Sequence, residues 1–445
     1  MVEHQGARAT TWPPLETIQS GLIGIIAFSA AIAPLGVPTL LALLVVVTLA
    51  QDRAEGQRLH SYLPTLTSNA GSLYAIMFMF FAFLSCAWAL RPGYTFVSLS
   101  QNAFVGLGSW YVAMALDRRL RLLGRGRQTR FTRALPLAFV FAALYFLLDA
   151  LTGDSITLFF ARKAPWIFDG FENVIRYTRS GVPVGLASDY FNRIAAALVM
   201  MLPGLAAAFL FWPWPRWGRW LGSAAFVVLV LVCEKSGSAT ALLALVAGAA
   251  LFIFALYSAH WARRLLQVGF LILIVGAVPL AMVPRALKLD ESALLPFSFR
   301  ERVIIWDDLA SLSLNSPILG IGAKSIKFWP ALPSHKVVRK SEKPETRKYW
   351  HPHNGYLQVW LELGAIGAAL FALAGTLLLG RIGHLRTRMQ PYAIALAAGT
   401  LVMIGPGWGL WQPWLIGSIG FGWLALLMVS FEFEQSQQPD AAKLA

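Results

Sequence analysis

Charged residues are scarce in this chain. They make up 13% of its 445 residues, against about 25% in soluble proteins. Acidic residues are scarcer than basic ones, with 22 Asp and Glu against 37 Lys and Arg. Cysteine is nearly absent, because the chain has only Cys86 and Cys233, both in apolar runs. These shortages exclude an ordinary cytosolic enzyme, a nucleic-acid-binding module, a disulfide framework and a cysteine-based metal site.

Apolar sequence is what the chain has in abundance. Hydrophobic residues make up 57% of it, and the mean hydropathy is +0.60. About 20 mostly apolar residues suffice to cross a bilayer, so the sequence predicts an all-α integral membrane protein with about twelve transmembrane helices. The predicted spans are residues 20–36, 37–50, 72–90, 95–116, 134–151, 193–212, 220–233, 239–258, 265–283, 355–379, 391–405 and 411–430. We expect one polytopic membrane domain, residues 1–445, with no removable signal peptide.

Arginine in the short loops sets the expected orientation. Residues 117–133 hold seven arginines, and further basic residues lie in 213–219, 259–264 and 380–390. Counting spans places these segments and both termini on one side, which the positive-inside rule assigns to the cytoplasm. Two larger loops, 152–192 and 284–354, then face the periplasm, and residues 432–445 form a cytoplasmic tail.

The second large loop is basic as well, although the topology places it outside the cytoplasm. Positive-inside bias weakens in loops longer than about 60 residues, so the topology stands. Two explanations of the charge stay open. The loop holds an anionic substrate such as a phosphorylated lipid, or it is a generally basic surface that meets anionic headgroups.

The segment from Trp350 to Gln358, WHPHNGYLQ, is the most informative one. His351 and His353 stand where this loop enters a predicted span, and histidine is the side chain best suited to move a proton near neutral pH. Asn354 is a favourable N-cap for the helix that follows. The alternative is that these residues only cap the helix and bond to backbone. In an extended segment the two histidines point to opposite sides, and no further ligands accompany them, so we predict no metal.

The run His353-Asn354, then nine residues, then Gly364-Ala-Ile-Gly367 resembles the signature of bacterial O-antigen ligases. These are inner-membrane glycosyltransferases of a superfamily that includes O-antigen polymerases and O-linked oligosaccharyltransferases. The resemblance implies a GT-C-like fold, a site facing the periplasm of the bacterial cell inner membrane, and no cofactor. It also implies a glycan donor on undecaprenyl diphosphate, an acceptor on lipid A–core oligosaccharide, and a partnership with membrane lipid rather than nucleic acid.

A second motif of that family is Arg-x-x-x-Trp, here Arg302 to Trp306, followed by NSPILGIG over residues 315–322. Ser298 to Glu301 reads as a capping box. It places Arg300 and Arg302 in the first turn of a short helix, where arginine forks and free N–H groups hold anions. Both are candidate diphosphate ligands. The alternative is that Arg302 pairs with Asp307.

Other candidates lie elsewhere in the chain. Family members carry an arginine in the first loop, and we expect Arg176 or Arg179 to bind phosphate there, with Asp189 in support. Ala239 takes the place of a family arginine, so Lys235 either supplies that charge or pairs with Glu234.

Glu362 fits the family's E-x-G pattern. A carboxylate there is costly unless it is paired, so we assign it a structural or orienting role.

The expected reaction is an inverting, metal-independent transfer. His353 acts as general base on the acceptor hydroxyl, and arginines hold the departing diphosphate. The alternatives are an O-antigen polymerase, which would lengthen lipid-linked glycan, and a protein O-oligosaccharyltransferase. A transporter of lipid-linked glycans is the non-enzyme alternative, and the absence of an inverted repeat argues against it.

Overall fold

The structure is a computed structural model of a mainly helical chain. It describes residues 13–122, 125–163, 175–178, 180, 183–186, 188–211, 216–330, 332–333, 346–347 and 349–436. The described residues form two compact units. Unit 1 comprises residues 1–65, 105–238 and 417–445, and unit 2 comprises residues 66–104 and 239–416.

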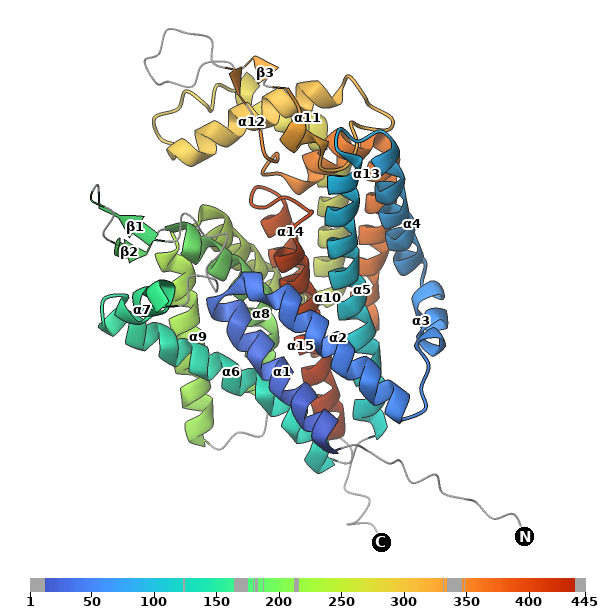
Figure 1. Cartoon of the computed structure of the whole chain (residues 1–445), viewed down its shortest axis with the longest axis vertical. Coiled ribbons are helices and arrows are strands. Elements are labelled where there is room, and N and C mark those ends of the chain that lie inside the picture. Colours follow the sequence, from blue (N-terminus) through green and yellow to red (C-terminus); the bar gives the residue numbers. More distant parts are fainter. Residues whose placement is uncertain are drawn as a thin grey trace. The chain divides into compact units, whose positions relative to one another are not determined.

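Unit 1 is built from the N-terminal helices, the middle of the chain and the last helix (Figure 1). Its elements are α1 (Pro13–Ile32), α2 (Val37–Ala54), α6 (Arg125–Leu151), α7 (Ser155–Lys163), the strands β1 (Ile175–Tyr177) and β2 (Pro183–Leu186), α8 (Ser188–Phe211), α9 (Arg216–Lys235) and most of α15 (Pro413–Ser436). The two strands pair antiparallel. Gly24 on α1 packs next to Ala134 on α6, and a Cβ at Gly24 would meet the Ala134 carbonyl oxygen at 3.5 Å, an ordinary van der Waals distance.

Unit 2 contains α4 (Ala70–Leu84), α10 (Ala239–Val275), α11 (Ala277–Ala286), α12 (Phe297–Ser313), α13 (Gly355–Arg381) and α14 (Gln390–Ile404). The short strands β3 (Leu332–Pro333) and β4 (Thr346–Arg347) pair antiparallel. Helix α5 (Pro92–Leu122) begins in unit 2 and continues into unit 1, and α3 (Leu63–Thr67) lies at the other junction. In Figure 1, α4, the start of α5 and α13 run side by side, while α11 and α12 lie across the end of α13.

Nine helices in the described part of the chain are long and apolar enough to cross a membrane. They span residues 15–32, 34–54, 70–87, 133–151, 190–211, 217–235, 239–275, 355–384 and 413–431. The prediction of an all-α, multi-pass membrane protein is confirmed at this level. Each of the twelve predicted segments overlaps a helix over most of its length, although 20–36, 72–90, 265–283, 391–405 and 411–430 also include non-helical residues. Among the described residues, nine spans replace the twelve predicted ones, and the difference arises at three places. Helix α10 continues through a kink at Ser258 and counts once. Helix α14, with 15 residues, is shorter than a span, and α5 is not among the nine.

An ion cluster around the buried Asp52 holds α2 against the part of α5 that belongs to unit 1. Asp52, on α2, accepts hydrogen bonds from Arg118 at 2.9 Å, Arg119 at 2.5 Å and the Tyr111 hydroxyl at 2.6 Å. Glu55 accepts a further bond from Arg118 at 2.6 Å. Two of the seven arginines in the basic segment 117–133 are therefore neutralised by carboxylates, which a buried charge requires.

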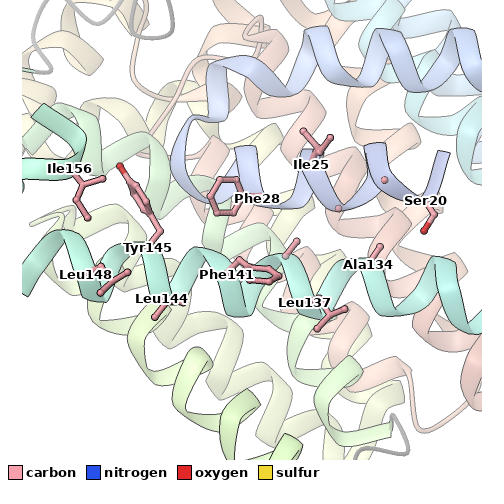
Figure 2. Close-up of a pocket in the computed structure, with 13 residues that line it drawn as sticks. Ser20, Ile25, Phe28, Ala134, Leu137, Phe141, Leu144, Tyr145, Leu148 and Ile156 are labelled. Atoms are coloured by element: carbon pink, nitrogen blue, oxygen red, sulfur yellow. The ribbon is translucent and has the colours of Figure 1, made fainter. Parts of the chain in front are cut away.

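An apolar groove of about 710 Å³ lies between α1 and α6, also in unit 1. Figure 2 shows Ile25 and Phe28 on one wall, with Leu137 and Phe141 on the other. Tyr145 is the groove's main polar residue, and its hydroxyl is already bonded to Thr157. The lining suits hydrocarbon rather than a charged ligand.

Helix α13 is broken at Gly364, and a loop fills the break. Gly364 has φ of 61° and ψ of −161°, a conformation essentially restricted to glycine. The carbonyls of Leu361 and Glu362 accept from Ile321 and Gly322, both at 2.9 Å. In exchange, the Ala365 N–H donates to the Pro317 carbonyl at 2.8 Å. These bonds from the loop give buried backbone groups at the break the partners that burial requires.

We predict that Gly364→Ala destabilises unit 2 by about 3 kcal/mol or more, through backbone strain and a clash. An added Cβ would lie 2.3 Å from the Ile318 carbonyl oxygen. The matched control is Gly269→Ala, since Gly269 is helical and has open space around it. Thermal unfolding of both purified variants measures the difference. Equal unfolding temperatures would contradict the assigned role of the break.

Candidate functional site

The histidine pair stands directly before α13. Asn354 caps the helix as predicted, because its side chain accepts from the N–H groups of Tyr356 and Leu357, both at 3.1 Å. The prediction that the histidines point to opposite sides is wrong, since their ring centroids lie 4.0 Å apart. His353 has φ of 50°. This left-handed turn ends the extended alternation and brings the two rings together.

Hydrogen bonds fix which ring nitrogens carry protons. His353 Nδ1 lies 3.2 Å from the Gly407 carbonyl oxygen. A carbonyl only accepts, so Nδ1 is the donor and Nε2 keeps its lone pair. His351 Nδ1 accepts the backbone N–H of His353 at 3.2 Å, so its proton sits on Nε2. The pair therefore presents one basic nitrogen, from His353, and one N–H donor, from His351.

The surroundings of both histidines disfavour the charged imidazolium. Burial is the largest cause that lowers the pKa of His351, and the charges of His353, Lys324 and Arg302 add to it, bringing the pKa to about 3. Burial also lowers the pKa of His353, as does Arg302, while the Gly407 carbonyl acts in the opposite direction. A neutral imidazole is the form that can accept a proton.

Helix α12 is tied to the histidine segment by the Arg-x-x-x-Trp motif. Trp306 donates its indole N–H to the Pro352 carbonyl, between the two histidines, at 3.0 Å. Arg302 is one turn earlier on the same helix face, and its charge acts on both rings. The spacing of the motif therefore has a physical reason: Trp306 anchors the histidine segment, and Arg302 adds a cation beside it.

Arg302 is half-buried, and burial lowers its pKa. It donates to the Thr240 hydroxyl at 3.3 Å. Within the described residues it forms no ion pair, so the alternative pairing with Asp307 is not seen. A desolvated arginine without a carboxylate partner can bind an anion.

The predicted capping box is wrong. Helix α12 begins at Phe297 with Pro296 as its N-cap, and no side chain caps it. Ser298 is therefore inside the helix, and Arg302 lies in the second turn rather than the first. Arg300 rests over the Phe297 ring at 5.9 Å, and its Nε has no hydrogen-bond partner among the described residues. Its role as a diphosphate ligand stays a prediction.

Glu362 is fully buried on α13 and links three segments. It accepts from Gln358 at 3.1 Å, from the Trp411 indole N–H at 2.5 Å and from the backbone N–H of Lys324. These donors compensate a carboxylate that would otherwise be costly in this position. The contacts agree with an orienting role for Glu362, which stays a prediction.

Lys324 is a site residue that the sequence did not single out. It has φ of 59°, rare outside glycine. Burial lowers its pKa, and the Glu362 carboxylate opposes that effect. Its charge acts on His351. The two glycines before it, Gly320 and Gly322, signal an irregular loop, but only the packing of that loop on α13 places Lys324 beside the histidines.

The remaining predicted residues belong to unit 1. Lys235 pairs with Asp154 at 3.1 Å and lies 4.9 Å from the centre of the Phe191 ring, so the predicted alternative pairing with Glu234 is wrong. Arg179 lies outside the described residues, and for Arg176 and Asp189 only the backbone is described. The diphosphate contacts proposed for these residues stay predictions.

No group of three or more metal-ligating side chains occurs in the part of the chain that the structure describes. Asp308, close to the histidine segment in space, is instead bonded to the Tyr349 hydroxyl.

The comparisons with known proteins point to the same family. A model of the O-antigen ligase family matches residues 224–372, the stretch that carries Arg302, Trp306, the histidines and Gly364. This stretch is similar to the O-antigen ligase family. The resemblance drawn from the His-Asn and glycine motifs is thereby confirmed.

Curated proteins that the chain is similar to come from Rickettsia, under the name "Putative polysaccharide ligase". The Rickettsia bellii protein is 29% identical over 211 residues, covering 46% of this chain and 50% of the relative. The Rickettsia conorii protein is 34% identical over 134 residues, covering 29% and 31%. The Rickettsia felis protein is 28% identical over 208 residues, covering 46% and 50%. The chain thus spans at most about half the length of these relatives.

We predict that Trp306→Phe lowers activity because it frees the histidine segment while keeping the ring. Leaving the Pro352 carbonyl unpaired destabilises the fold by about 1–3 kcal/mol. Trp360→Phe is the matched control, since the Trp360 indole donates to the Ile274 carbonyl at 2.6 Å. Both variants lose one indole hydrogen bond, but only Trp306→Phe should slow glycan transfer, by roughly tenfold or more. Equal rates would show that this anchor does not position the histidines.

Proposed function

We propose that this protein is an O-antigen ligase that transfers a glycan from undecaprenyl diphosphate to lipid A–core oligosaccharide at the periplasmic face of the inner membrane. The observation that carries the proposal is His353: its Nδ1 is held by the Gly407 carbonyl, which leaves Nε2 free to accept a proton. The family match and the multi-pass fold support a ligase-type glycosyltransferase.

The reaction is a direct displacement. The acceptor hydroxyl oxygen forms a bond to the anomeric carbon while the bond from that carbon to the diphosphate breaks. The hydroxyl proton goes to His353 Nε2, and the electron pair leaves with the diphosphate, so the anomeric configuration inverts. A departing diphosphate is already ionised and needs cations rather than a general acid.

Arg302 is the cation that the site supports best for the diphosphate. It is desolvated, it lacks a carboxylate partner among the described residues, and its planar fork suits phosphate oxygens. Lys324 adds a second positive charge near His351. Arg300, Arg176, Arg179 and Lys235 are proposed as further diphosphate ligands, with Asp189 in support. We propose no metal or cofactor in this mechanism.

An O-antigen polymerase and a protein O-oligosaccharyltransferase would use the same donor and the same base. The three functions differ in the acceptor alone, so the acceptor is the decisive experimental variable. A transporter would need no base, and the arrangement of His353 favours an enzyme.

We expect His353→Ala to slow transfer roughly 10²–10⁴-fold, the usual contribution of a general base. The assay combines purified protein, lipid-linked glycan and rough lipopolysaccharide, and it measures smooth lipopolysaccharide. His384→Ala, an exposed histidine on another segment, is the control. Donor binding is measured in parallel and should persist in both variants.

Full transfer by His353→Ala would exclude it as the base and direct attention to His351. If the unaltered protein lengthens lipid-linked glycan instead of forming smooth lipopolysaccharide, it is a polymerase.

The pH dependence follows from the lowered pKa of His353. Below that pKa the imidazole is protonated and cannot act as a base, so activity is lost as the pH falls through it. We expect kcat/KM to be constant from about pH 7 upward and its acid midpoint to lie below about 6.5, the ordinary value for histidine. In Arg302→Gln the midpoint should rise, because one positive charge near His353 is removed.

Size-exclusion profiles at each pH separate loss of catalysis from loss of folding. A midpoint that does not move in Arg302→Gln would show that another group controls the profile.

A further inference from the structure

An exposed group of aromatic rings surrounds a lysine next to the histidine segment. We call Tyr94, Lys327, Phe328 and Trp350 the aromatic platform. Lys327 donates to the Tyr94 hydroxyl at 3.1 Å. Its Nζ lies 4.8 Å from the centre of the Tyr94 ring, 5.1 Å from that of Trp350 and 5.8 Å from that of Phe328.

The rings are placed by three segments that are distant in the sequence. Tyr94 belongs to the first turn of α5, Phe328 ends the short helix η5 (Ser325–Phe328), and Trp350 precedes His351. The hydroxyl of Thr95 donates to the Ala323 carbonyl at 2.9 Å, and the Ser325 hydroxyl accepts the Leu90 N–H at 3.1 Å. These bonds fix α5 against η5, so the platform is preformed.

The platform is not part of the apolar core. Trp350 is 71% exposed and Tyr94 is 42% exposed. A tryptophan that is held by a cation yet keeps most of its surface open has a free aromatic face. Clusters of exposed aromatic residues mark surfaces that interact with a ligand, a partner or the membrane interface.

The platform carries uncompensated positive charge. Within the described residues Lys327 forms no ion pair, and neither does Arg91, whose guanidinium lies 5.6 Å from the centre of the Phe328 ring. Lys324, three positions before Lys327, adds a further positive charge, and besides burial the Lys327 charge is among the causes that lower the pKa of Lys324. A ligand that fits here offers an apolar face to the rings and an anionic group to the lysines.

The platform adjoins the histidine pair, because Trp350 directly precedes His351 and its ring centre lies 5.1 Å from Lys327 Nζ. Arg302 approaches the same segment from α12, where Trp306, one turn further along, donates to the Pro352 carbonyl. In a direct displacement the leaving group and the nucleophile lie on opposite sides of the reacting carbon. If the diphosphate is held at Arg302, the acceptor belongs at the platform.

We propose that the aromatic platform binds a sugar of the acceptor oligosaccharide that carries a phosphate or carboxylate group, with its ring stacked on Trp350 and its anionic group held by Lys327. Sugar rings have an apolar face of C–H groups that packs on aromatic rings, and their charged substituents attract ammonium groups. The proposal rests on the proposed function, because it assigns the diphosphate to Arg302.

The test is direct binding, which needs neither donor nor turnover. Purified full-length protein is titrated by calorimetry with delipidated, phosphorylated core oligosaccharide and with the same oligosaccharide after phosphatase treatment. We expect Trp350→Ala to weaken binding of both forms by about tenfold or more, and Trp350→Phe to retain most of the affinity.

Lys327→Gln should weaken binding of the phosphorylated form and leave the dephosphorylated form nearly unchanged. The matched controls are Trp261→Ala, at an equally open site with 65% exposure, and Lys288→Gln, an exposed lysine elsewhere in the same predicted loop. Neither control should change either affinity. Because Trp350 is exposed, its substitution leaves the core packing intact.

Three results would overturn the proposal. The first is equal affinity in Trp350→Ala and the unaltered protein, and the second is no binding of either oligosaccharide. The third is measured in nanodiscs with brominated lipid, which quenches nearby tryptophan fluorescence. If Trp350→Phe lowers the quenched fraction among the 17 tryptophans, Trp350 contacts the bilayer instead.

Failure of the platform and failure of the ligase function are distinguishable. If the protein binds core oligosaccharide but transfers no glycan, the platform proposal is supported and the ligase proposal is rejected. If Trp350→Ala transfers glycan with an unchanged KM for the acceptor, the ligase proposal is supported and the platform proposal is rejected.

Discussion

The exchange of hydrogen bonds at Gly364 is the constraint on which the candidate site depends. A membrane helix normally satisfies its own backbone, since hydrocarbon offers no partners. Helix α13 instead gives two carbonyls to Ile321 and Gly322 and takes a carbonyl from Pro317 in return. These backbone hydrogen bonds attach the loop to the helix. Lys324 follows immediately, and its N–H reaches Glu362.

Helix α12 adds a second constraint from the opposite side of the histidine segment. Leu309 on α12 and Leu357 and Leu361 on α13 are fully buried in one apolar cluster, and burying each contributes about 2 kcal/mol. With α12 fixed in this way, the Trp306 indole meets the Pro352 carbonyl and Arg302 lies beside the rings. The apolar packing and the polar site are therefore parts of one arrangement.

The resulting environment suits chemistry that needs a neutral base near cations. Positive charges beside a histidine normally weaken it as a base, but they also keep it unprotonated at neutral pH. The Gly407 carbonyl compensates in part by orienting the proton on Nδ1. A base of modest strength is sufficient when the leaving group is a stabilised diphosphate, because the cations supply much of the driving force.

The sequence alone was enough for the fold class, because long apolar runs have few structures available in a bilayer. It also predicted the Asn354 cap, a local interaction within three residues. Its motifs identified the family, and the family match includes them. The count of spans was harder, because a helix that continues through a kink, as at Ser258, looks like two separate spans in a hydropathy pattern.

Only the tertiary structure decided how the site is assembled. The pairing of the histidines depends on the left-handed φ of His353, which no alternation rule anticipates. Helix α12 starts at Phe297, earlier than predicted, because Pro296 rather than Ser298 is its N-cap. Lys324 was one basic residue among many in its loop until Gly364 opened the helix and the loop packed into it. These features arise from contacts between residues tens of positions apart, and local sequence patterns carry no information about such contacts.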